Sequence, residues 1–314
     1  MYEDLKLITG NSNKTLAKAI AKKLGVKLTD TQVSRFSDGE IRVKINENIR
    51  GKDVFVVQST HPPAENLLEL LIMLDAVRRA SAEKITAVIP YFGYGRQDRK
   101  DQPRVPVTAK LIANLLTEAG ADRVLTIDLH AGQIQGFFDI PVDHLFGSQI
   151  LLDYFKKKRI KNVVMVSPDV GGIKVTRSCA KRMGSSLALI DKRRPAPNES
   201  EVMNVIGEIK DKNALIIDDL VDTAGTLTEA ASALIKNGAK SVRAGATHPV
   251  LSGNAIERLI KSPIEKLIVT DTVPLQKEKQ IPKIEILTVS DIFSEAIKRI
   301  HEEKSISILF EHYD

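Results

Sequence analysis

The sequence predicts an α/β protein made of two tandem domains, each a mainly parallel sheet flanked by helices. Short apolar runs alternate with longer amphipathic stretches almost throughout the 314 residues. Alternation of strands and helices on this scale favours parallel sheets with helices on both faces. The chain is also long enough for two domains of ordinary size.

The individual elements follow from these runs in chain order. The apolar runs of the first half predict strands at Leu5–Thr9, Asp53–Gln58, Ile85–Pro90 and Arg123–Asp128. Those of the second half predict strands at Val163–Ser167, Ser186–Asp191, Ala214–Asp218, Val242–Thr247 and Lys266–Thr270. The amphipathic stretches predict helices at Asn13–Leu24, Ala64–Ala80, Thr108–Ala119, Ser148–Lys158, Gly172–Met183 and Thr226–Asn237.

The two halves also resemble each other. Residues of the first half recur in the second at one constant offset: Thr108, Leu116, Gly120-Ala121, Val124 and His130 correspond to Thr226, Leu234, Gly238-Ala239, Val242 and His248. Chance similarity of two helix–glycine–strand units is the alternative. A duplication predicts domains at 1–147 and 148–304, with 305–314 as a tail strand that returns to the first domain.

Composition limits the function classes. Hydrophobic content of 43% and charged content of 27% are typical of a globular protein. The single cysteine, Cys179, cannot form an internal disulfide, which fits a reducing compartment. The sequence has no apolar run of membrane-spanning length, and with 4% aromatic residues and a net charge of +6 it shows no nucleic-acid groove. We therefore expect a cytoplasmic protein with neither membrane nor nucleic acid as partner.

The segment Leu215–Leu227 is the most informative of the chain. A buried strand delivers Asp218 and Asp219, and the residues Asp222, Thr223, Ala224, Gly225 and Thr226 lead into a helix. Backbone N–H groups of such a turn can converge on a phosphate at the helix N-terminus. The alternative is an ordinary strand-to-helix turn with solvated acids. The combination resembles the phosphoribosyl-diphosphate (PRPP) loop of the phosphoribosyltransferase fold.

Other loops carry groups suited to phosphates or a base. Phe36 beside Asp38, Gly39 and Glu40 could stack on a base, although a plain hairpin turn is the simpler interpretation. Arg96–Lys100, after a predicted strand, is placed to bind phosphates. Lys192-Arg193-Arg194 opens a proline-containing segment that predicts a long basic loop, with a merely solvated loop as the alternative.

Two further strand ends could hold a metal. His130 follows one predicted strand, and Asp169 lies between another strand and a helix. Asp169 could bind Mg²⁺ or simply be the N-terminal carboxylate of that helix. Lone histidines are as often structural. Carboxylates and phosphates suit Mg²⁺, and the Cys/His clusters of zinc sites are lacking.

Together with Asn11–Asn13 and His61–Asn66, these motifs resemble, in order and over almost the whole chain, the phosphate-activated bacterial-type class I of the ribose-phosphate diphosphokinase (PRPP synthase) family. The resemblance implies two phosphoribosyltransferase-like domains that make PRPP and AMP from ATP and ribose 5-phosphate with Mg²⁺. The first domain would be the ATP side, and the second would hold the PRPP loop.

The resemblance also implies roles for individual residues. ATP would bind Phe36, Asp38, Gly39, Glu40, Arg96 and Gln97; Mg²⁺ would bind His130 and Asp169. Ribose 5-phosphate would bind Arg194, Asp218, Asp219, Asp222, Thr223, Ala224, Gly225 and Thr226, with Lys192 and Arg194 as catalytic cations. A homo-oligomer, expected to be a hexamer, would respond to phosphate and ADP through Arg50, Arg79, Lys100, Gln135, Asp143, Ser305, Ser307 and Phe310.

Two other function classes stay open at this point. A phosphoribosyltransferase that consumes PRPP would share the PRPP loop, but the duplication and the Lys192–Arg194 segment argue against it. A non-catalytic regulatory homologue of the synthase would be expected to lose Lys192, Arg194 or the acid pair, and this chain keeps all of them.

Overall fold

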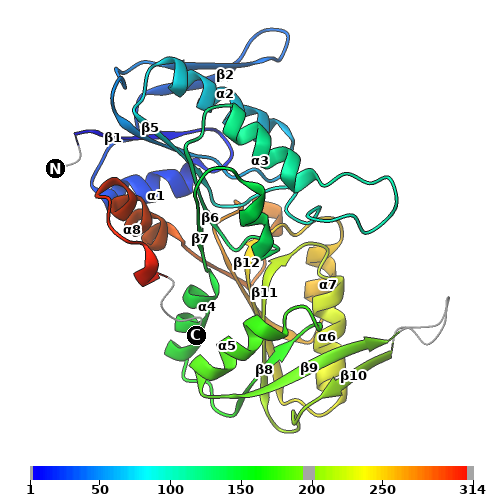
Figure 1. The fold of residues 1–314 in the computed structure, drawn as a ribbon. Coiled ribbons are helices and arrows are strands. Elements are labelled where there is room, and N and C mark those ends of the chain that lie inside the picture. Colours follow the sequence, from blue (N-terminus) through cyan, green and yellow to red (C-terminus); the bar gives the residue numbers. More distant parts are fainter. Residues whose placement is uncertain (1–2, 194–201, 310–314) are drawn as a thin grey trace. The chain divides into compact units, whose positions relative to one another are not determined.

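A computed structural model describes residues 3–193 and 202–309. Over this part the chain divides into two compact units (Figure 1). Unit 1 comprises residues 3–146, 272–274 and 288–309, and unit 2 comprises residues 147–193, 202–271 and 275–287. The division between Phe146 and Gly147 lies within one residue of the expected boundary. Residues 288–304, however, which we expected in the C-terminal domain, belong to unit 1.

Unit 1 is built on a five-stranded sheet in the order β1-β4-β5-β6-β7, in which every neighbouring pair is parallel. Its elements are β1 (Leu5–Thr9), α1 (Lys14–Leu24), β2 (Thr31–Arg35), β3 (Ile41–Ile45), β4 (Asp53–Val57), α2 (Glu65–Arg79), β5 (Lys84–Ile89), α3 (Thr108–Glu118), β6 (Arg123–Ile127), the 3-10 helix η1 (Gly132–Phe137), β7 (Val142–Leu145), α8 (Ser290–His301) and the 3-10 turn η3 (Ser307–Leu309). Strands β2 and β3 form a separate antiparallel hairpin.

The core of unit 1 follows from helical and strand periodicity. Every residue of β5 after Lys84 is buried, as expected for a strand covered on both faces. Helix α2 buries Leu67, Leu70, Leu74 and Val77 at helical spacing against this sheet. Helix α8 lies beside α1 (Figure 1) and joins it through an ion pair between Lys23 and Asp291 (2.7 Å). Packing between these distant segments explains why α8 belongs to unit 1.

Unit 2 contains a seven-stranded sheet in the order β10-β9-β8-β11-β12-β13-β14, parallel except for the β9–β10 pair. Its elements are α4 (Ser148–Lys157), β8 (Val163–Ser167), α5 (Ile173–Met183), β9 (Ser186–Arg193), β10 (Val202–Ile206), β11 (Asn213–Val221), α6 (Gly225–Lys236), β12 (Ser241–Pro249), α7 (Ala255–Lys261), β13 (Ile264–Thr270), the 3-10 turn η2 (Lys277–Lys279) and β14 (Ile284–Leu287). The predicted fold class, two mainly parallel sheets flanked by helices, is confirmed.

The internal repeat corresponds to real structural units. Helix α3 followed by β6 in unit 1 matches α6 followed by β12 in unit 2. The histidines of the repeat differ in setting, because His130 is exposed in a loop whereas His248 is buried inside β12. The repeat therefore preserves the scaffold but not the surroundings of this side chain.

Two local predictions are wrong. The basic segment was expected to be a loop from Lys192 onward, but Lys192 and Arg193 lie in β9 and pair with Met203 and Val202 of β10. Antiparallel pairing thus extends the strand into a polar segment. The expected tail strand is also absent from residues 305–309, because Ser307 N–H donates to Ser305 Oγ (3.1 Å) and the chain turns into η3.

No helix in the part of the chain that the structure describes is long and apolar enough to span a membrane.

Candidate active site

Many of the predicted substrate- and metal-binding residues lie at one edge of each sheet, where the parallel strands end. In unit 1 they follow β5 and β6, and in unit 2 they follow β8 and occupy the end of β11. The carboxyl ends of parallel strands are the usual place for ligands in α/β folds. Each unit therefore presents its candidate residues at the edge where ligand binding is expected.

The PRPP-like turn of unit 2 is shorter than the sequence suggests, and hydrogen bonds from a neighbouring loop hold it in place. Strand β11 runs to Val221 and α6 begins at Gly225, so only Asp222–Ala224 connect them. Ser252 holds the turn from the side: its N–H donates to the Asp222 carbonyl (3.1 Å), and its hydroxyl donates to the Asp222 carboxylate. The N-terminus of α6 has no side-chain cap among the described residues. Its first N–H groups are therefore available to an anion.

The residue with unusual backbone geometry in this turn is Ala224, which has φ 59° and ψ 8°. Gly225, the next residue, has no positive φ. A Cβ atom at Gly225 would instead lie 3.3 Å from Nη1 of Arg258, a residue of α7. The absence of a side chain at Gly225 thus makes room for a guanidinium group that sequence reasoning missed.

The acid pair lies inside β11 rather than beyond its end. Pairing with β8 stops at Ile216, whereas pairing with β12 continues to Val221. The β8 side of the strand is therefore open beside Asp218 and Asp219. Within the pair, Asp219 N–H donates to Asp218 Oδ1 (3.0 Å).

A third carboxylate, that of Asp169, acts on the same pair. Burial raises the pKa of Asp218 well above its ordinary value, the neighbouring Asp219 raises it further, and the charge of Asp169 adds a smaller effect. Asp169 Oδ1 accepts from the N–H of Gly172 (2.8 Å), the residue just before α5, so this carboxylate lies near the N-terminus of that helix. A bound cation or hydroxyl donor would relieve the repulsion among these acids.

The hairpin of unit 1 presents an aromatic ring and two acids at its tip. Phe36 N–H donates to the Glu40 carbonyl (2.9 Å), and Glu40 N–H donates to Asp38 Oδ1 (3.0 Å). The Phe36 side chain is 50% exposed, with the Arg42 guanidinium 5.4 Å from its ring centre. The predicted turn is confirmed, and its exposed ring is accessible to a planar ligand.

The loops after β5 and β6 lie against each other. Gln133 Nε2 donates to Asp98 Oδ2 (3.0 Å), and a Cβ atom on Gly95 would lie 3.8 Å from Cβ of His130. Arg96 and His130 are both exposed. Gln97 contacts the first residue of α3, because its Oε1 accepts from the Thr108 hydroxyl (2.5 Å). The structure thus brings together the predicted phosphate-binding loop and His130.

A buried carboxylate supports the loop that follows β1. Glu69 of α2 accepts from Asn11 N–H (2.9 Å), from Asn11 Nδ2 (2.6 Å) and from Gln58 Nε2 (2.9 Å). Asn11 Nδ2 also lies 3.3 Å from the Val33 carbonyl in the hairpin. The Asn11–Asn13 motif is thereby tied to the base of the element that presents Phe36.

The two cations predicted to be catalytic are only partly described. Lys192 lies in β9, but Arg194 falls outside the described residues, as does Phe310 of the regulatory set. No group of three or more His, Cys, Asp or Glu side chains in the described residues forms a complete metal cage.

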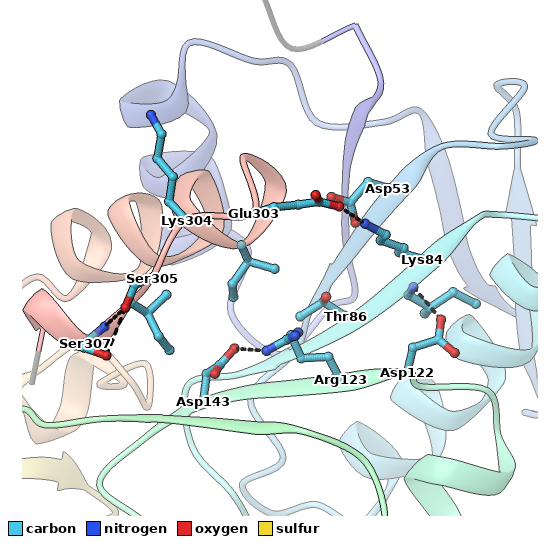
Figure 2. Close-up of a pocket in the computed structure, with 13 residues that line it drawn as sticks. Asp53, Lys84, Thr86, Asp122, Arg123, Asp143, Glu303, Lys304, Ser305 and Ser307 are labelled. Atoms are coloured by element: carbon cyan, nitrogen blue, oxygen red, sulfur yellow. Dashed lines mark hydrogen bonds and ion pairs between the residues drawn. The ribbon is translucent and has the colours of Figure 1, made fainter.

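A cavity of about 590 Å³ in unit 1 lies at the opposite edge of the sheet from these loops (Figure 2). Asp53, Lys84 and Arg123, the first residues of β4, β5 and β6, line it. Of the expected regulatory residues, Asp143, Ser305 and Ser307 also line it, and among the described residues Arg50, Arg79, Lys100 and Gln135 do not.

Ion pairs form much of the cavity wall. Arg123 pairs with Asp143 (2.7 Å), and Lys84 pairs with Glu303 (2.7 Å), as Figure 2 shows. Burial raises the pKa of Asp53, although His301 Nδ1 lies 2.8 Å from its Oδ2. Lys84, Arg123 and Glu303 stand in no motif, so sequence reasoning could not identify them.

Parallel sheets in which a strand with two acids leads through a short turn into an uncapped helix define a phosphoribosyltransferase-like fold. Two sequence families match the chain: the N-terminal domain of ribose phosphate pyrophosphokinase over residues 5–120, and the phosphoribosyl synthetase-associated domain over residues 193–311. The chain belongs to the ribose-phosphate pyrophosphokinase family.

Individual relatives are similar over nearly their full length. The ribose-phosphate pyrophosphokinase of Chlorobaculum tepidum is 56% identical over 99% of this chain and 96% of its own length. That of Bacillus caldolyticus is 58% identical, over 98% of each chain. The crystal structure of phosphoribosylpyrophosphate synthetase from Mycobacterium smegmatis superimposes with a TM-score of 0.90 at 40% identity, over 96% of this chain and 100% of that one.

Proposed function

We infer that the chain transfers the β,γ-diphosphoryl group of ATP to the anomeric hydroxyl of ribose 5-phosphate, giving PRPP and AMP. Relatives at 56–58% identity over nearly their full length are named for this activity. The observation that supports it best in the structure is the short turn at 222–224 between the acid pair and the uncapped helix α6. Such a turn suits a sugar phosphate.

In this reaction the anomeric oxygen forms a bond to the β-phosphorus of ATP. The bond from that phosphorus to the oxygen shared with the α-phosphate breaks, AMP leaves, and the hydroxyl proton is released. Phosphoryl-type transfer asks the protein mainly to position reactants and to stabilise charge.

The site residues divide between the two substrates. Residues Asp222–Thr226 would hold the 5-phosphate, and Asp218 and Asp219 would accept from the ribose hydroxyls. Phe36, Asp38, Gly39 and Glu40 would bind adenine, and Arg96 and Gln97 the triphosphate. Lys192 and Arg194 would stabilise charge that develops on the transferred group and on the AMP oxygen.

Mg²⁺ fits the donor groups that are present. Protein-bound Mg²⁺ usually keeps several waters and binds one or two carboxylates together with substrate phosphates. The exposed carboxylate of Asp169 offers one ligand of this kind. His130 and Asp169 would hold the ion, and when bound it would neutralise part of the triphosphate charge.

The activity can be tested by measuring AMP release from ATP in reactions that contain or lack ribose 5-phosphate. We expect AMP only in the complete mixture, and its loss when EDTA removes Mg²⁺. AMP release that does not depend on ribose 5-phosphate would contradict the proposed reaction.

We further propose that the chain acts as a homo-oligomer, a hexamer, with phosphate as activator and ADP as inhibitor at a site between subunits. Asp143, Ser305 and Ser307 already line one cavity within a single chain. Arg50, Arg79, Lys100, Gln135 and Phe310 would complete the site, in part from other copies.

Deleting residues 305–314 is expected to abolish phosphate activation and the part of ADP inhibition that is not competitive with ATP, or to disrupt the oligomer. The deletion removes Ser305, Ile306 and Ser307 from the cavity wall. Initial rates across a phosphate titration, with the mass of the assembly from light scattering, measure both effects. A double variant, S305A/S307A, keeps the chain length and tests the hydroxyls alone. If the truncated chain keeps its assembly and its full phosphate response, the regulatory site lies elsewhere.

A further inference from the structure

We propose that Arg258, a residue of α7 outside every motif of the site, is a positioning residue for the 5-phosphate of ribose 5-phosphate. This inference rests on the proposed function. Arg258 Nη1 donates to the carbonyl of Thr223 at 3.0 Å. It thus reaches the phosphate-binding turn from a separate helix that lies beside α6 (Figure 1).

The bond to Thr223 fixes the direction of the next N–H group. The peptide between Thr223 and Ala224 is planar and trans, so its C=O and N–H point in opposite directions. Because the carbonyl points to Arg258, the N–H of Ala224 points away from α7. That N–H is one of the groups proposed to bind the 5-phosphate.

Ala224 needs such a constraint because its backbone is left-handed, with φ 59°. Residues other than glycine rarely adopt this conformation unless their surroundings impose it. On the helix side, the Ala224 carbonyl accepts from Thr228 N–H (3.0 Å) and from Thr228 Oγ1 (2.8 Å). On the strand side, Arg258 holds the carbonyl of Thr223. Ala224 is therefore fixed at both of its peptide bonds.

Within the described part of the chain, Arg258 also forms no ion pair. Among the described residues no carboxylate lies within ion-pair distance of it, and the adjacent Glu257 pairs instead with Lys261 (2.6 Å). The guanidinium is exposed and passes close to Gly225, where a Cβ atom would lie 3.3 Å from Nη1. An unpaired cation beside the N-terminus of α6 adds to the positive potential that an anion meets there.

The test compares Arg258→Gln and Arg258→Lys with Lys261→Gln, a control on the next turn of the same exposed helix. We expect Arg258→Gln to raise the KM for ribose 5-phosphate about tenfold, as for the loss of one aligned hydrogen bond to a charged group. The KM for ATP and kcat should stay within about twofold of the wild type. The KM of Arg258→Lys for ribose 5-phosphate should lie between those of Arg258→Gln and the wild type, because this variant keeps the charge. The KM of Lys261→Gln should match that of the wild type.

A second readout needs no turnover: the rise in melting temperature that ribose 5-phosphate causes. We expect this rise in the wild type and in Lys261→Gln, and a smaller rise at the same concentration in Arg258→Gln. If AMP formation fails but this pattern holds, the proposed reaction is wrong and the role of Arg258 stands.

Three results would overturn the role of Arg258. The first is a KM for ribose 5-phosphate in Arg258→Gln within about twofold of the wild type. The second is a KM in Arg258→Gln that rises equally for ribose 5-phosphate and ATP, together with a lower melting temperature in the absence of ligand. That pattern would indicate a purely structural residue. The third is that ribose 5-phosphate does not stabilise the wild type.

Discussion

Lys192→Ala is expected to reduce turnover by roughly 10²–10³-fold, with much smaller changes in both KM values. A cation that meets charge developing on the transferred group and on the leaving AMP oxygen stabilises the transition state more than the bound substrates. The backbone of Lys192 pairs with Met203 in the β9–β10 ribbon. Steady-state rates of AMP formation at saturating substrates measure the effect.

A suitable control is Lys161→Ala, which removes an exposed cation from the same unit before β8. It should leave turnover unchanged. Turnover of the Lys192 variant close to that of this control would remove Lys192 from the catalytic machinery.

Gly225→Val is expected to reduce ribose 5-phosphate affinity by about two orders of magnitude while the fold is retained, since it disturbs several aligned contacts to one anion. The branched side chain would lie where the Arg258 guanidinium now passes, 3.3 Å from a Cβ atom, and next to the Thr223 hydroxyl at 3.8 Å. It would displace Arg258 and crowd the N–H groups at the start of α6. Calorimetric titration with ribose 5-phosphate measures the affinity.

The matched control is Ser232→Val, which places the same side chain on an exposed turn of the same helix. Far-ultraviolet circular dichroism of both variants reports the fold. Affinity equal to that of the control would mean that the turn is structural and that the 5-phosphate binds elsewhere.

Most of the fold was predictable because parallel strands are buried on both faces. Strands such as β5 and β6 therefore stand out as continuous apolar runs between amphipathic helices. The extension of β9 beyond Asp191 and its pairing with β10 were not predictable in this way, since the pairing involves Lys192, Arg193 and Asn204, which are not apolar. The assignment of α8 to unit 1 depends on its contact with α1, which no local pattern records.

The candidate site was predictable where its residues are adjacent in sequence. Asp218, Asp219 and the turn at 222–224 follow one apolar run of the sequence, and the structure links Asp169 to them through its effect on the pKa of Asp218. Arg258 was missed because its role depends on one long-range hydrogen bond to a backbone carbonyl. The residues of the cavity in Figure 2 come from strand starts and from the tail, so only the folded chain brings them together.

The position at which ATP is cleaved tests the central claim most directly. Phosphorus NMR of a complete reaction with ATP, ribose 5-phosphate and Mg²⁺ identifies every product. We predict AMP and a sugar with a diphosphoryl group on its anomeric oxygen, in equal amounts. ADP together with ribose 1,5-bisphosphate would show attack on the γ-phosphorus instead, and would contradict the assignment of this chain as a diphosphoryl-transferring enzyme.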